Sequence, residues 1–84
     1  MYIQSLQPTL ITNNSYLHVV ADRMGKLTIK VLDVQGMIAK RVTTYIQAGN
    51  QQLDLNLTDL TNGNYILNVF NGDIFLKSIP FKKQ

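Results

Sequence analysis

Hydrophobic and polar residues alternate along most of the chain, and this alternation predicts strands. Leu53 and Leu55 are flanked by polar residues, and the same period of two runs through residues 27–31 and 65–69. Successive side chains of a β-strand point to opposite faces, so this period indicates strands with one buried face. No window keeps the apolar spacing of a helix over three turns. The only helical element expected is a single turn near residues 57–60.

Turn-forming residues separate the apolar runs. Asn71-Gly72 joins two of them, and both residues tolerate positive φ, so the pair predicts a two-residue type I′ hairpin turn. Asp33 and Gly36 stand first and fourth in Asp-Val-Gln-Gly, the pattern of a type I turn that closes another hairpin. These four residues are therefore expected to have structural roles.

The runs and turns together predict an all-β fold, an immunoglobulin-like antiparallel β-sandwich of about seven strands. The expected strands cover residues 8–12, 15–21, 26–33, 37–46, 51–58, 64–70 and 73–81. Residues 37–46 break the period of two, so a bulge or an edge position is expected there, and Pro80 suits the same settings. The expected core is Leu17, Val19, Leu27, Ile29, Val31, Leu53, Leu55, Tyr65, Leu67 and Val69.

Tyr65 follows the Asn62-Gly63 corner closely, at the start of the sixth expected strand. In sandwiches a tyrosine at this place often turns its hydroxyl back to the backbone of the preceding corner. The alternative is an ordinary core tyrosine. We favour the interpretation in which the hydroxyl turns back to the corner backbone.

Composition and charge narrow the class of protein. The chain has 84 residues, 45% of them hydrophobic, and no cysteine, which indicates one small domain without disulfides. Its net charge is +3, but the basic residues are spread along the chain, which favours a solvated surface over nucleic-acid binding. No apolar run approaches the roughly 18 residues of a membrane span. The first ten residues show no signal peptide.

Candidate chemistry is sparse. His18 is the single histidine, the aspartates form no cluster spaced for a metal ion, and no serine has the setting of a nucleophile. Asp33 and Asp73 suit turns. We therefore expect no enzyme, with no catalytic residue, no metal and no cofactor.

One combination of motifs carries a resemblance. Residues 31–38 hold Asp33 and Gly36 in a "V-x-D-x-x-G" hairpin, residues 60–69 read "L-x-x-G-x-Y-x-L-x-V", and the chain closes with Lys82-Lys83. In this order and spacing, residues 6–84 resemble the C-terminal sorting domain of the type IX (Por) secretion system of Bacteroidota. Residues 1–5 are interpreted as a linker or an expression remnant. Members of the family usually start with a Pro-Asn-Pro-like segment, of which this chain keeps only Pro8.

The resemblance implies a role at the end of a larger cargo protein. Such a cargo crosses the inner membrane with its own signal peptide, passes transiently through the periplasm, and becomes secreted or attached to the cell surface. The implied partners are the outer-membrane translocon, a cell-surface sortase and the upstream cargo domain. Recognition is expected at the corner and the chain end, where a short strand end contributes little packing. The expected residues are Thr61, Asn62, Gly63, Asn64, Lys82 and Lys83.

Two other functions remain open from the sequence. One is a spacer module of immunoglobulin-like or fibronectin type III kind in a multidomain extracellular protein. The other is a carbohydrate-binding module, which needs a row of exposed aromatic side chains. Tyr2, Tyr16, Tyr45 and Phe75 are its candidates, although packing within strands is the preferred interpretation.

Overall fold

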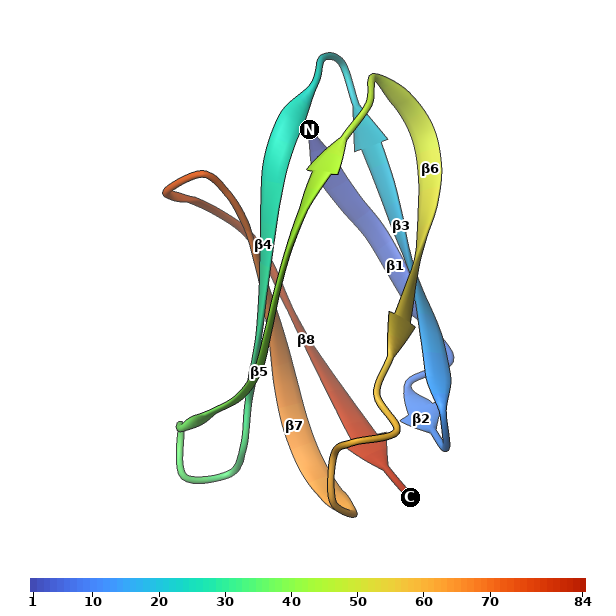
Figure 1. The fold of residues 1–84 in the computed structure, drawn as a ribbon, viewed down its shortest axis with the longest axis vertical. Helices are drawn as coiled ribbons and strands as arrows, with labels where there is room; N and C mark the ends of the chain where they lie inside the picture. Colours follow the sequence, from blue (N-terminus) through green and yellow to red (C-terminus); the bar gives the residue numbers. More distant parts are fainter.

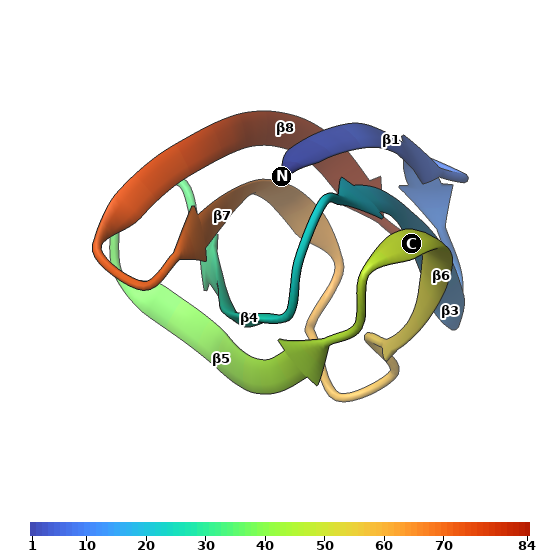
Figure 2. The ribbon, with the colours of Figure 1, turned by 90° about the horizontal axis from the view of Figure 1, so that it is seen from above.

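The computed structural model describes residues 1–84 and is built from strands and turns. Two sheets face each other, with the strand orders β1-β3-β6 and β2-β8-β7-β4-β5 (Figures 1 and 2). The expected all-β sandwich is confirmed, with eight strands. Their bounds are β1 Tyr2–Gln7, β2 Leu10–Ile11, β3 Asn14–Ala21, β4 Gly25–Leu32, β5 Ile38–Ile46, β6 Gly49–Asn56, β7 Gly63–Asn71 and β8 Ile74–Lys83.

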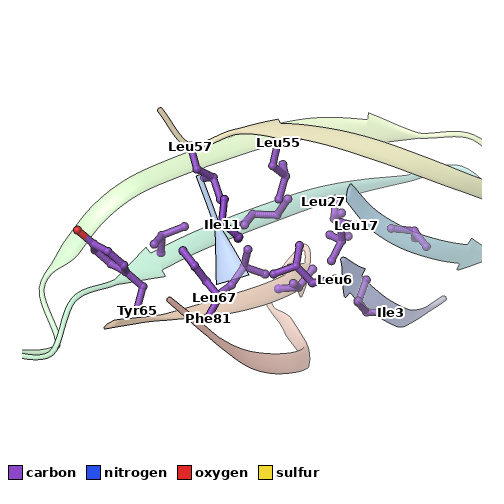
Figure 3. Close-up of a cluster of buried hydrophobic side chains, with 14 of the residues drawn as sticks. Ile3, Leu6, Ile11, Leu17, Leu27, Leu55, Leu57, Tyr65, Leu67 and Phe81 are labelled. Atoms are coloured by element: carbon purple, nitrogen blue, oxygen red, sulfur yellow. The ribbon is translucent and has the colours of Figure 1, made fainter. Parts of the chain in front are cut away.

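The core fills the space between the two sheets, where apolar side chains from both sheets meet (Figure 3). It comprises 17 buried hydrophobic residues, and Leu17, Leu27 and Leu67 at its centre have no exposed surface. The alternation in the sequence therefore identified the buried faces of β3, β4 and β7 correctly. Among the expected core residues, Leu53 is corrected, because it is half-buried.

The beginning of the chain differs from expectation. The expected strand at 8–12 shortens to β2, and residues 2–5, interpreted as part of a linker, lie in β1, which pairs with β3. Ile3 and Leu6 are both buried although they are three residues apart. The register shifts between Ile3 and Ser5, so a bulge at Gln4 turns both side chains inward. The bulge breaks the period of two and hides this strand from pattern analysis.

The last residues of the chain are tied to β2. Leu10 and Ile11 pair with Lys82 and Lys83, the one parallel pairing in the fold. The Lys82 amide donates to the Thr9 carbonyl oxygen at 2.8 Å, and the Gln84 amide donates to that of Ile11 at 2.8 Å. The expectation of a chain end with little packing is therefore wrong.

The hairpin between β7 and β8 turns one residue later than expected. Asn71 pairs with Ile74, so Gly72 and Asp73 form the two-residue loop. Gly72 has φ of 59°, whereas neither Asn71 nor Asp73 has a positive φ. A positive φ at the first loop position alone is the pattern of a type II′ turn, not of the expected type I′ turn.

Gly72→Val is expected to lower the free energy of unfolding by about 1–2 kcal/mol, the cost of the left-handed region for a side chain with a Cβ. An added Cβ meets no atom within 4 Å, so backbone conformation alone is tested. Urea denaturation followed by circular dichroism measures the effect. Gly72→Asn is the control and should cost less, because asparagine tolerates this region better. Equal losses would contradict the argument.

Strand β5 forms one edge of the five-stranded sheet and contains the expected irregularity. Val31 pairs with Lys40 and Leu32 with Ile38, so Ala39 is the extra residue of a bulge. Pro80 lies in β8 before the two residues that pair with β2, where the outer side of the strand has no partner. Both expectations about irregular strand positions are confirmed.

The two termini lie at opposite ends of the sandwich (Figure 1). The amino group of Met1 contacts Asp22 in the β3–β4 loop at 3.5 Å. Gln84 lies beside Ile11 at the other end. The domain measures 35 × 22 × 17 Å along its principal axes.

Candidate functional site

The pairing of β7 with β8 brings the expected recognition residues together. Gly63 lies opposite Lys83 and Asn64 lies opposite Lys82 in the register. Lys82 and Asn64 are exposed, as are Thr61 and Asn62 in the preceding corner. The corner and the chain end thus form one surface at the carboxyl-terminal end of the sandwich.

Lys83 is not part of that surface. Its residue is only 6% exposed, and its Nζ donates to the carbonyl oxygen of Leu60 at 3.1 Å. The lysine therefore ties β8 to the turn at residues 57–60, where the Leu60 amide donates to the Leu57 carbonyl oxygen. The expectation that Lys83 offers a surface charge is corrected by this burial.

An ion pair lies on the same turn. Lys40 Nζ is 2.9 Å from Asp59 Oδ2, and the hydrogen bond from this ammonium holds the pKa of Asp59 below its ordinary value. Because the carboxyl pKa is lower in the folded chain, the ion pair stabilises the fold at pH values above the ordinary aspartate pKa. This stabilisation is lost as the pH falls through the lowered pKa. The pair links β5 to the end of the turn that Lys83 also contacts.

Tyr65 holds the Thr61–Asn64 corner through a hydrogen bond and stacks on a residue of β8. Its hydroxyl donates to the Thr61 carbonyl oxygen at 2.6 Å and lies 3.2 Å from Thr61 Oγ1. Its ring stacks on Phe81, with the centroids 5.4 Å apart and the planes at 18°. In Figure 3 the hydroxyl points away from the core cluster. This is the corner arrangement that the sequence favoured, and it orders Thr61–Asn64 relative to β8.

Tyr65→Phe is expected to lower the free energy of unfolding by about 1 kcal/mol, the usual net value of one hydrogen bond. The ring and its stacking on Phe81 remain. Thermal and urea unfolding measure the effect. Tyr16→Phe is the control, because Tyr16 is 38% exposed and its hydroxyl has no hydrogen-bond partner within the chain. An unchanged midpoint in Tyr65→Phe would mean that only the ring matters.

Asp33 organises the neighbouring hairpin. Its Oδ1 accepts hydrogen bonds from the amides of Gln35 at 2.9 Å and Met37 at 3.0 Å. The Gly36 amide donates to the Asp33 carbonyl oxygen at 3.0 Å, and Gly36 has φ of 81°. Carboxylate and glycine together hold the β4–β5 hairpin as a rigid projection beside β7.

A groove of about 560 Å³ lies between this hairpin and the end of β8. Leu32, Ile66 and Pro80 lie side by side in the register on the outer face of the five-stranded sheet and line the groove. Val34 lines the hairpin side and is 81% exposed. Thr9, Asp33, Gly36, Asn64, Tyr65 and Phe81 complete the lining. Residues from both halves of the sequence motif thus meet at one apolar surface.

Comparison of the sequence with known protein families gives the family of the chain. The sequence matches the family described as "Secretion system C-terminal sorting domain" over residues 12–79, a stretch that contains both motif halves. The chain belongs to this family. The resemblance to the type IX sorting domain is therefore confirmed. No curated protein matches the chain significantly.

Membership gives the sorting domain its general role. It serves as a sorting signal for type IX secretion, and it belongs to a protein that is exported, either secreted or displayed at the cell surface. The family is one of secretion signals and is not enzymatic in general. No helix of the sorting domain is long and apolar enough to cross a membrane.

Sequence analysis missed three groove residues of the sorting domain, Val34, Ile66 and Pro80. A signal for two of them was present, because Ile66 and Pro80 are apolar at positions that alternate with buried neighbours. An apolar residue on the solvent side of a strand has no core to enter and indicates a contact surface when others lie beside it. Recognising that they are neighbours requires the register of β4, β7 and β8.

The exposed aromatic residues of the sorting domain form no single row. Tyr2 and Tyr16 belong to the three-stranded sheet, whereas Tyr45 and Phe75 belong to the five-stranded sheet. All four are exposed. The ring of Phe75 nevertheless packs edge-on against Phe70 of β7, with the centroids 5.6 Å apart, as the interpretation of packing within strands expects. Their division between two sheets does not support a carbohydrate platform.

Proposed function

We propose that the groove and the adjoining corner are the surface by which the outer-membrane translocon recognises the sorting domain and the cargo joined upstream. The observation that supports this most is the meeting of the two motif halves in the lining of one apolar groove, with Asp33, Val34 and Gly36 from the first half and residues 64–66 from the second. Asn64 supplies a polar group to its lining, Lys82 lies opposite Asn64 in the register, and Asn62 belongs to the adjoining corner.

The geometry of the groove suits a protein partner. Its apolar lining includes Val34, Ile66 and Pro80, which are all exposed in the free domain. Burial of such side chains drives protein association, and the polar rim supplies hydrogen bonds. The hairpin that Asp33 holds and the corner that Tyr65 holds are both hydrogen-bonded, so the surface is ordered before it binds.

We further propose that the cell-surface sortase cuts before Tyr2 and joins the released cargo to the cell surface. The pairing of Tyr2–Gln7 with β3 supports a cleavage point upstream of this strand, because a protease needs an extended and accessible chain. The complete chain, including β1, is therefore the unit to fuse to a cargo.

The test is a reporter fusion. Residues 1–84, placed behind a signal peptide and a fluorescent protein, should carry the reporter outside a Bacteroidota cell that has an intact Por translocon. In a translocon-deficient strain the reporter should accumulate in the periplasm. Retention in the periplasm of the competent strain would reject the proposal, and the spacer function would replace it.

A pair of variants tests the groove itself. Ile66→Glu places a charge in the groove and should reduce export strongly. Met24→Glu is the matched control, because Met24 is 70% exposed in the β3–β4 loop at the other end of the domain. Circular dichroism should show that both variants fold. Normal export of a folded Ile66→Glu variant would remove the groove from the proposal.

A further inference from the structure

The outer face of the five-stranded sheet carries a second hollow, at the end away from the groove. The hollow measures about 360 Å³, and Lys26, Lys30 and Arg41 line it together with the threonines at positions 28 and 43. Lys26 and Lys30 alternate with buried residues of β4, and Lys30 lies opposite Arg41 in the register. All three cations therefore point away from the core on one face.

These cations have no carboxylate partner. The ion pairs of the chain all involve Asp22 or Asp59, and none of them includes Lys26, Lys30 or Arg41. The lining includes a single acid, in the β7–β8 turn. Three cations facing one carboxylate leave the hollow with a net positive charge, which attracts anions.

The strand register places two of these cations close enough to repel each other. Like charges at directly opposite positions destabilise a sheet, and Lys30 and Arg41 occupy such positions. Lys30 Nζ lies 4.8 Å from the centroid of the Phe70 ring, a contact that orients the ammonium but does not neutralise it. A bound anion would relieve this repulsion.

Apolar side chains project beside the cations. Phe75 is 54% exposed at the β7–β8 hairpin and lies opposite Phe70, whose ring Lys30 Nζ contacts. Figure 2 shows this hairpin on the side of the five-stranded sheet that faces away from β3 and β6. Tyr45, opposite Lys26 in the register, is 76% exposed. Cations beside exposed aromatic and aliphatic side chains are typical of surfaces that bind the membrane interface.

We propose that this face of the domain binds a membrane surface of anionic, phosphate-bearing lipid headgroups. The three cations meet the phosphates, while Phe75 and Tyr45 enter the boundary between headgroups and acyl chains. An acidic protein segment would satisfy the cations but has no evident use for the projecting hairpin. This inference does not depend on the proposed recognition groove.

The test is sedimentation of the full chain with lipid vesicles. Vesicles with equal parts of phosphatidylglycerol and phosphatidylcholine should bind the chain, and binding should weaken as salt is added. Vesicles of phosphatidylcholine alone should bind it far less. Lys26→Ala/Arg41→Ala should weaken binding about 25-fold, at about fivefold for each basic residue near an anionic surface. Phe75→Ser should also weaken binding.

A matched double variant separates this face from net charge. Arg23→Ala/Lys77→Ala removes the same charge from exposed positions that do not line the hollow, and it should weaken binding much less. Circular dichroism should show that both double variants fold. The proposal would be overturned by equal losses in the two, by absent vesicle binding, by binding to polyglutamate but not to vesicles, or by complete competition from inorganic phosphate at constant ionic strength.

Discussion

Deleting Lys82, Lys83 and Gln84 is expected to lower the free energy of unfolding by about 3 kcal/mol or more, from about 1 kcal/mol for each of at least three lost hydrogen bonds. Two of these are the backbone bonds to Thr9 and Ile11, and the third joins Lys83 Nζ to the Leu60 carbonyl oxygen. Urea denaturation followed by circular dichroism measures the change. Reduced export after such a truncation would therefore report lost stability as well as lost recognition.

Single substitutions separate the effect of the chain end on stability from its effect on recognition. Lys83→Met keeps much of the aliphatic stem but leaves the Leu60 carbonyl oxygen without its donor, so it should cost about 1–3 kcal/mol. Lys82→Met is the control, because the Lys82 side chain is exposed and its backbone bond to Thr9 remains. If the truncation left the unfolding midpoint unchanged, the contacts of the chain end would contribute nothing to stability.

Leu67→Ala is expected to lower the free energy of unfolding by about 2–5 kcal/mol, the usual range when a buried leucine is truncated. Leu67 has no exposed surface, and β7 lies between β8 and β4. The loss combines the transfer free energy of the removed carbons with the cavity left behind. Chemical denaturation gives the value directly.

The neighbouring residue provides the contrast. Ile66 points to the outer face and is 43% exposed, so Ile66→Ala should cost less than about 1 kcal/mol, as expected for a partly exposed side chain that leaves no enclosed cavity. The two substitutions should therefore have separate effects, with Leu67→Ala lowering stability and Ile66→Ala lowering export of a stable protein. Similar losses of stability at both positions would contradict the assigned register of β7.

Most of the sandwich could be predicted because one face of each long strand is buried. In β4 and β7 every second residue enters the core, and the period of two shows this directly. The hairpin around Asp33 and Gly36 could be predicted for a similar reason, since its turn chemistry is local. The corner at Tyr65 also depends on residues only four positions apart.

The features that the sequence did not predict depend on contacts between distant segments or on irregular backbone. The bulge at Gln4 removes the alternation that would have indicated β1. Lysine is almost never fully buried, so the burial of Lys83 is visible only once Leu60 lies beside it. The groove joins hairpin and corner residues, which become neighbours only when β4 pairs with β7.

The placement of the two termini at opposite ends has a consequence for cargo choice. A polypeptide joined before Met1 emerges beside the β3–β4 loop, and the groove lies toward the other end of a body 35 Å long. The point of attachment is thus at the end of the sandwich away from the groove. We therefore expect the sandwich to act as a spacer between cargo and groove, so that unrelated cargo proteins leave access to the groove unchanged.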